Sequence, residues 1–229
     1  MRPLRLRQFE SFWVTHMPRA LNIAVTSPGG NAYGEYTAGS IWKVYVYLMV
    51  YAHLTPADIV LDWGAGVMKV CLGLAFLSGC TALGIEIETT LHNRSRHIVS
   101  AARCAFGARV AALNCDSSNI LSFVPTTIVV CYDGPTGALY EDTHYAIMRN
   151  VFLSPTVRAI VSTQMSQFRF EQYFPDGLRF WRCIKLGPMC FGRGNYQVYM
   201  WLRRRSSNNT AGVLVDPRMA SLLAKAHKK

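Results

Sequence analysis

The sequence predicts an α/β domain built around a mostly parallel β-sheet. Short apolar runs that stop at turn-forming residues recur along the 229 residues, and segments with helical character separate them. The last two runs follow each other with no helix between them. Alternating strands and helices predict parallel strands with right-handed crossovers, and the final pair predicts an antiparallel hairpin at the sheet edge.

The N-terminal quarter differs from the rest of the chain. A basic arm containing Arg2, Arg5 and Arg7 is followed by a strong break at 27–31 and by an apolar helix expected over 37–53. The alternation starts only after this helix. We therefore expect three parts: an N-terminal arm and helix over 1–55, the main domain over 56–205, and a basic C-terminal tail over 206–229.

The main domain contains five expected parallel strands and three expected helices. The strands are short apolar runs bounded by turn residues, at 58–62, 82–86, 109–113, 126–132 and 157–162. The helices between them are expected over 67–78, 89–106 and 139–150. Two β-rich runs, 178–186 and 196–202, then form the hairpin. A parallel sheet closed in this way resembles the Rossmann-like architecture of class I methyltransferases, although a fold alone does not establish a function.

Composition limits the possible functions. Hydrophobic residues make up 51% of the chain and charged residues 16%, which favours a packed core over disorder. We expect neither a membrane span nor a secretory signal. Seven cysteines without a CxxC pair predict reduced thiols inside the cell, and no metal site. The net charge of +11 predicts a nucleic-acid partner, although a basic protein without such a partner stays an alternative.

A glycine turn follows the first expected strand and suggests a cofactor site. Asp62, Gly64 and Gly66 lie where ligands bind in such sheets, and Glu86 ends the next strand, where it can accept the hydroxyl groups of a ribose. A dinucleotide fingerprint would have a third glycine, but Lys69 occupies that position. The carboxylates instead favour S-adenosylmethionine, which carries an ammonium and a sulfonium. An ordinary glycine turn with surface acids is the alternative.

The next two strand ends complete the expected pocket. Asp116, after the third strand, can accept a hydrogen bond from the adenine amine, or it can cap a helix. Cys131 ends the fourth strand beside the cofactor and is followed by Tyr132 and Asp133, where the methyl acceptor should meet the sulfonium.

Upstream, Tyr33-Gly34-Glu35 completes a set of motifs that resembles the Dot-one (disruptor of telomeric silencing) histone lysine methyltransferases. In that family a Tyr-Gly-Glu loop folds over the cofactor, and the resemblance implies cofactor contacts from Tyr33, Glu35 and Thr37. It also implies the cofactor roles of the residues already named, together with a protein lysine as acceptor. The similarity covers about residues 30–205.

Several positions depart from the family pattern. Met68 and Lys69 replace a glycine and a glutamine, and Tyr36 stands before Thr37. The family's Asn-Asn-Phe is replaced by the residues 131–133, so the acceptor stays open. A lysine acceptor would need an aromatic channel that keeps its amine uncharged, and four rings could line it: Tyr33, Tyr132, Phe191 and Tyr199.

Two alternatives to a lysine acceptor remain. Residues 132–135 partly resemble the motif of enzymes that methylate amino groups of nucleic acids, in which Asp133 would bind the exocyclic amine of a flipped base. A non-catalytic domain that binds nucleic acid is the other alternative. The catalytic candidates are Tyr33, Tyr132, Asp133 and Phe191.

The partners follow from the charge and the resemblance. We expect a nuclear monomer that acts on a histone or nucleosome. Basic residues near the C-terminus are expected to bind nucleic acid through its phosphates: Arg203, Arg204, Arg205, Lys228 and Lys229.

Overall fold

A computed structural model describes residues 4–16, 36–131, 141–163, 165–191, 194–204 and 216–227. For 141–143, 190–191 and 194–196 it describes the backbone alone. Several predicted site residues lie outside the described residues: Tyr33, Glu35, Tyr132, Asp133, Arg205, Lys228 and Lys229.

The core of the molecule is a seven-stranded sheet in the order β3-β2-β1-β4-β5-β7-β6. The strands β1 to β5 pair in parallel, and β7 pairs antiparallel with both β5 and β6. This confirms the predicted parallel sheet closed by a hairpin. The strands are β1 (Ile59–Trp63), β2 (Thr81–Glu86), β3 (Val110–Asn114), β4 (Ile128–Cys131), β5 (Ala159–Ser162), β6 (Trp181–Phe191) and β7 (Gly194–Arg203).

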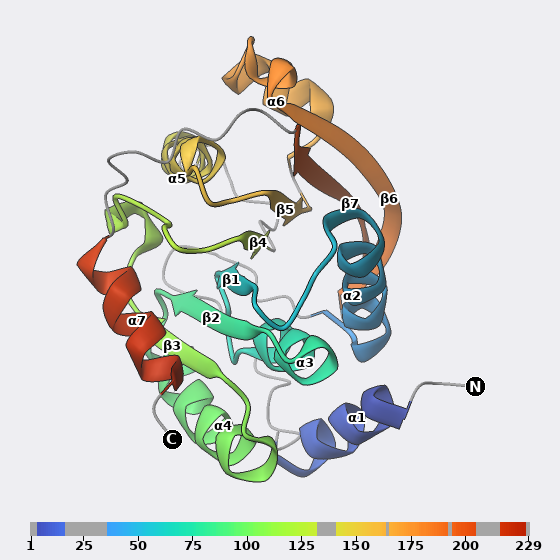
Figure 1. Ribbon diagram of the computed structural model, residues 1–229, viewed down its shortest axis with the longest axis vertical. Coiled ribbons are helices and arrows are strands. Elements are labelled where there is room, and N and C mark those ends of the chain that lie inside the picture. Colours follow the sequence, from blue (N-terminus) through green and yellow to red (C-terminus); the bar gives the residue numbers. More distant parts are fainter. Residues whose placement is uncertain are drawn as a thin grey trace.

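Helices cover both faces of the sheet (Figure 1). One hydrophobic cluster joins the sheet to the four helices α1 (Leu4–His16), α2 (Ala38–Ala52), α3 (Lys69–Ser78) and α4 (Thr89–Phe106). A second cluster on the other face joins it to α5 (Glu141–Leu153), α6 (Gln167–Tyr173) and α7 (Pro217–His227). Since every parallel strand is covered on both sides, its burial explains the continuous apolar runs in the sequence.

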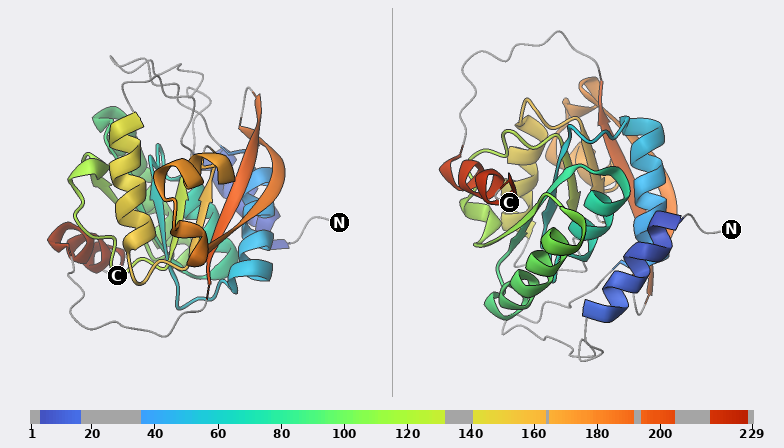
Figure 2. Two further views of the ribbon diagram at one scale, coloured as in Figure 1. Left: turned by 90° about the horizontal axis from the view of Figure 1, so that it is seen from above. Right: turned by 60° about the horizontal axis from the view of Figure 1, so that its bottom comes forward.

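Both ends of the described chain pack against the rest of the structure, α1 on the helices α2 and α3 and α7 on the strands β2 and β3. Helix α1 buries Leu6, Phe9 and Phe12 in the first cluster. Helix α7 buries Met219 and Leu222 in the second. Parts of the expected N-terminal arm and of the expected C-terminal tail therefore form helices, α1 and α7 (Figure 2).

The strand order reverses between β1 and β4. The chain moves from β1 to β2 and β3 on one side and then returns to β4 on the other side of β1. Ligands of open α/β sheets bind outside the carboxyl ends of the strands at this point. The residues that follow β1 therefore occupy the position expected for a cofactor.

None of the helices in the described part of the chain is long and apolar enough to cross a membrane.

Candidate active site

The structure brings the predicted glycine turn and its two carboxylates together. Gly64 and Gly66 have φ values of +75° and +54°, which glycine adopts without steric cost. The backbone N–H of Gly66 donates to Oε2 of Glu86 at 2.7 Å. A Cβ added at Gly64 would meet no atom of the described residues within 4 Å, so none of their side chains fills the space beside the turn.

Asp62 is buried directly below this turn. It is 4% exposed, and its Oδ2 lies 4.0 Å from the Sγ of Cys71. Burial, reinforced by the negative charge of Glu86, holds the pKa of Asp62 well above its ordinary value. A positively charged ligand beside these acids would stabilise their ionised forms.

Glu86 ends β2 with both carboxylate oxygens engaged by backbone. Oε2 accepts from Gly66, and Oε1 accepts from the N–H of Glu88 at 2.8 Å. Burial raises the pKa of Glu86, and these two hydrogen bonds oppose the increase. Each oxygen retains a second lone pair, which can accept a ribose hydroxyl.

Met68 and Lys69 leave the turn open although both are larger than their counterparts in the Dot-one family. Met68 has a φ of +71° and is buried, and its side chain lies over Gly84, where an added Cβ would come within 2.0 Å of Sδ. The Nζ of Lys69 lies 4.8 Å from the ring centroid of Trp13 in α1. Neither side chain blocks the space at Gly64.

Other predicted cofactor contacts have a structural role in the described residues. Thr37 caps α2, since its Oγ1 accepts from the N–H of Ser40 at 3.2 Å. Asp116 caps a short 3₁₀ turn, because Oδ1 accepts from the N–H of Ser118 at 2.8 Å. Asp116 is half-buried, and its contact with adenine stays a prediction.

Cys131 ends β4 at the predicted position, but its side chain is buried. Its Sγ donates to the carbonyl oxygen of Val161 at 3.5 Å. This burial and hydrogen bond are those of a packed strand cysteine, and its predicted contact with the cofactor stays a prediction.

Arg203 does not project into solvent as a nucleic-acid contact would. Its guanidinium donates to the carbonyl oxygens of Val157, Phe152 and Ser154 and lies 4.6 Å from the ring centroid of Trp181. Burial lowers its pKa. These contacts oppose the predicted nucleic-acid role of Arg203, whereas Arg204 is exposed.

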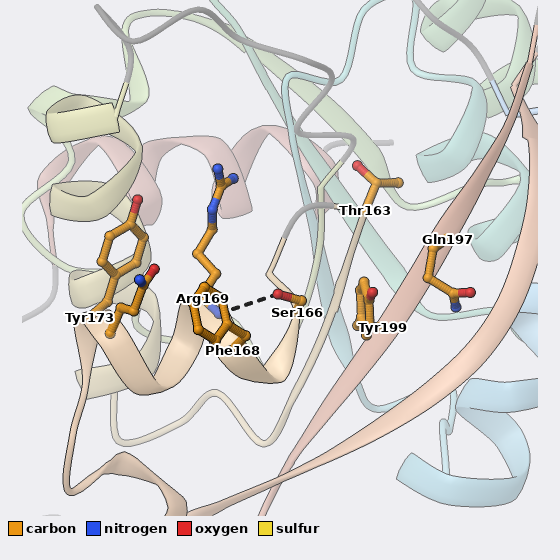
Figure 3. Close-up of a pocket in the computed structure, with 8 residues that line it drawn as sticks. Thr163, Ser166, Phe168, Arg169, Tyr173, Gln197 and Tyr199 are labelled. Atoms are coloured by element: carbon orange, nitrogen blue, oxygen red, sulfur yellow. Dashed lines mark hydrogen bonds between the residues drawn. The ribbon is translucent and has the colours of Figure 1, made fainter.

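A pocket of about 490 Å³ opens beside the carboxyl end of β5 (Figure 3). Strand pairing brings the pocket residue Tyr199 to this end of the sheet. Ser162, the last residue of β5, pairs with Cys131 of β4 on one side and with Tyr199 of β7 on the other. The pocket mixes hydroxyl, amide, aromatic and guanidinium groups, from Thr163, Ser166, Phe168, Arg169, Gln172, Tyr173, Gln197 and Tyr199.

Of the pocket residues, sequence analysis named only Tyr199. Phe168, Arg169, Gln172 and Tyr173 lie on α6, and Gln197 lies on β7. Thr163 and Ser166 lie between β5 and α6, where Ser166 caps the helix by accepting from the N–H of Arg169 at 3.2 Å. For Phe191 only the backbone is described, at the end of β6.

Among the described residues, no group of three or more His, Cys, Asp or Glu side chains is arranged to hold a metal ion.

Solved structures with the same fold are methyltransferases. Magnesium protoporphyrin IX methyltransferase from Synechocystis, solved with bound SAM, is 12% identical with a TM-score of 0.58, over 89% of this chain and 99% of that one. The human methyltransferase 10 domain containing protein is 13% identical with a TM-score of 0.57, covering 86% and 97%. An rRNA methylase from Streptococcus thermophilus is 13% identical with a TM-score of 0.50, covering 71% and 95%.

These similarities establish the class I methyltransferase fold. No protein-family model and no curated protein matches the sequence. The first of these structures holds the ligand that the glycine turn and carboxylates predict for this chain. The comparisons contain nothing specific to the Dot-one family.

Proposed function

We propose that this protein is an S-adenosylmethionine-dependent methyltransferase. The observation that carries the proposal is the pair of buried carboxylates, Asp62 and Glu86, on either side of an open glycine turn. In the described residues neither acid forms an ion pair with a Lys or Arg. Two acids buried together favour a cationic ligand. NAD would instead place its negatively charged phosphates at this turn.

The proposed chemistry assigns simple tasks to the chain. S-adenosylmethionine supplies a methyl group on a positively charged sulfur, and that group is transferred by in-line displacement. Asp62 and Glu86 bind and orient the cofactor. The turn at 64–66 brings the backbone close to it. The pocket beside β5 must align the acceptor and exclude water, since holding two reactants in line removes a large part of the barrier to such a displacement.

A protein lysine is the acceptor that we infer first, in a histone or another protein bound to nucleic acid. Tyr199 and Tyr173 give the pocket aromatic walls, on which a lysine side chain can lie. Loss of water from the lysine amine on binding would lower its pKa and make it nucleophilic. We propose a nuclear site of action on the same grounds.

A nucleobase is the second acceptor that a specific observation favours. Phe168 is 71% exposed at the pocket, so it offers a surface for stacking. The amides of Gln172 and Gln197 provide donors and acceptors for the edge of a flipped base.

Calorimetry with S-adenosylmethionine tests the cofactor site directly. We expect wild-type binding, and loss of binding in Asp62→Asn with an unchanged circular dichroism spectrum. Asp176→Asn is the matched control, because this acid is exposed on the surface. No binding at millimolar ligand would favour the non-catalytic alternative.

Transfer of a tritiated methyl group then identifies the acceptor. Nucleosomes, separated histones, RNA and DNA are incubated with the protein and the labelled cofactor. Label in histone supports the lysine proposal, and label in RNA or DNA supports the nucleobase proposal. Tyr199→Ala should reduce transfer while leaving cofactor affinity unchanged.

A further inference from the structure

Two helices beside β3 carry many basic residues and no acidic ones. Helix α4 contains Arg94, Arg96 and Arg103, and α7 contains Arg218 and Lys225. Neither helix contains an Asp or Glu, and β3 has none. A basic helix surface usually alternates with carboxylates, because opposite charges three or four positions apart stabilise a helix. Such a concentration of one sign is therefore unusual.

The two helices meet around the β3 edge of the sheet. Helix α4 lies on one face and α7 on the other, so both border this edge strand (Figure 1). Arg103 connects them, because its guanidinium donates to the carbonyl oxygens of Val110 in β3 and Lys225 in α7. Arg103 thus has a structural role, and it holds Lys225 beside α4.

Two further cations of this edge have no acidic partner among the described residues. Arg96 and Lys225 are exposed and form no ion pair with a described residue. His92 and Arg96 lie one helical turn apart in α4, and the bond from Arg103 places Lys225 beside that helix. Burial, and to a smaller extent the charges of Arg96 and Lys225, lowers the pKa of His92. The nearest acids in the sequence are Glu88 and Asp216, and each binds backbone N–H groups at the start of a helix.

We propose that the β3-edge face, formed by His92, Arg96 and Lys225, binds the phosphate backbone of a nucleic acid. Phosphates supply the negative charges that the face lacks, and a basic protein of net charge +11 attracts such a polyanion from a distance. None of these three residues is among the predicted cofactor contacts.

The position of this face separates docking from the proposed chemistry. The strand order places β3 four strand steps from β5, which begins the pocket. At about 4.8 Å a step, the distance is about 19 Å, or about 6 base pairs of duplex at 3.4 Å each. A nucleic acid held at β3 can therefore span the distance to the pocket and place a substrate, or a protein bound beside it, there.

Salt-dependent binding to a 20-base-pair DNA duplex tests the proposal. The variant is Arg96→Gln with Lys225→Gln. The control is Arg182→Gln with Lys185→Gln, which removes two exposed charges from β6 at the opposite edge of the sheet. The binding assay uses the full chain without cofactor. A negative result would therefore contradict the docking proposal and leave the proposed cofactor site untested by it. Thermal melting checks that both variants fold.

The expected result is a specific change in slope. Each lost phosphate contact reduces the slope of log affinity against log salt by about 0.9, so the β3-edge variant should lose about 1.8. At 0.1 M salt this corresponds to a loss of affinity on the order of 50-fold. The control should keep the wild-type slope. Equal losses in both variants, or none in the first, would overturn the proposal, as would binding of polyglutamate in preference to the duplex.

Discussion

Replacement of Gly84 by alanine tests how the cofactor turn is held in place. Gly84 lies in β2 beneath the turn, and its Cβ would lie 2.0 Å from Sδ of Met68 and 2.7 Å from Cβ of Ala65. Met68 can move its flexible end, but the Cβ of Ala65 is fixed to the backbone. The new methyl group therefore forces the turn away from the sheet.

The cost of this substitution can be calculated in two parts. Overpacking of a core usually costs about 1–3 kcal/mol, and at about 2–4 °C per kcal/mol the melting temperature should fall by about 2–12 °C. The displaced turn also weakens the 2.7 Å bond from Gly66 to Glu86. A hydrogen bond to a charged group contributes about 1.5–3 kcal/mol, so cofactor affinity should fall by about tenfold to a hundredfold.

Thermal melting and calorimetry with S-adenosylmethionine measure the two effects. Gly39→Ala is the control, because its added Cβ would meet only Oγ1 of Thr37, at 4.0 Å. A helical glycine replaced in this way should leave stability equal or slightly higher. Combining Gly84→Ala with Met68→Gly should recover part of the loss, since the contact with Ala65 persists. A Gly84→Ala protein that melts and binds like the control would refute the reasoning.

Three further predictions concern single residues. The raised pKa of Asp62 leaves its carboxyl protonated above the ordinary carboxyl range. Cofactor affinity should therefore rise with pH, by up to about tenfold per unit, until Asp62 ionises. Asp62→Asn should abolish this rise, as measured by calorimetry. By the same linkage, the stability that the neutral acid provides without cofactor is lost as pH rises through its pKa, so the melting temperature should fall there. Glu86→Gln places an amide opposite one of two N–H groups, and should cost about 1–3 kcal/mol in thermal unfolding. Arg203→Gln should lower stability by about 2–4 kcal/mol through its lost carbonyl contacts, and leave DNA affinity in a gel-shift assay unchanged; a normal melting temperature would contradict the first half of this prediction, and weakened DNA binding the second.

Hydrophobic pattern was sufficient to predict the sheet but not every strand boundary. The expected hairpin strand 178–186 ended at Gly187-Pro188, whereas β6 continues through them to Phe191. A β-bulge between Lys185 and Gly187 accommodates this segment, and Gly187 has a φ of +86°. Proline is tolerated at 188 because β6 is an edge strand, whose outer N–H groups need no partner. Edge position depends on strand order, which a local pattern does not contain.

Separation along the sequence explains why the cofactor turn was predictable and the pocket was not. Asp62, Gly64 and Gly66 are adjacent in the chain, and parallel pairing of consecutive strands places Glu86 beside them. The pocket instead needs α6 and the hairpin to meet at β5. That contact depends on pairing Ser162 with Tyr199, which lie far apart in the sequence.

The substitution of Met68 for a glycine connects the sequence departure to the packing beneath it. A left-handed residue other than glycine costs about 1–2 kcal/mol, so the position requires compensation. Met68 obtains it by burying its side chain, which reaches the space left by the absent Cβ of Gly84. Two positions thus depend on each other: Gly84 makes room for Met68, and Met68 fills the cavity that Gly84 would otherwise leave. The open turn is kept in this chain by packing rather than by a third glycine, which is why a fingerprint based on glycine alone describes this site poorly.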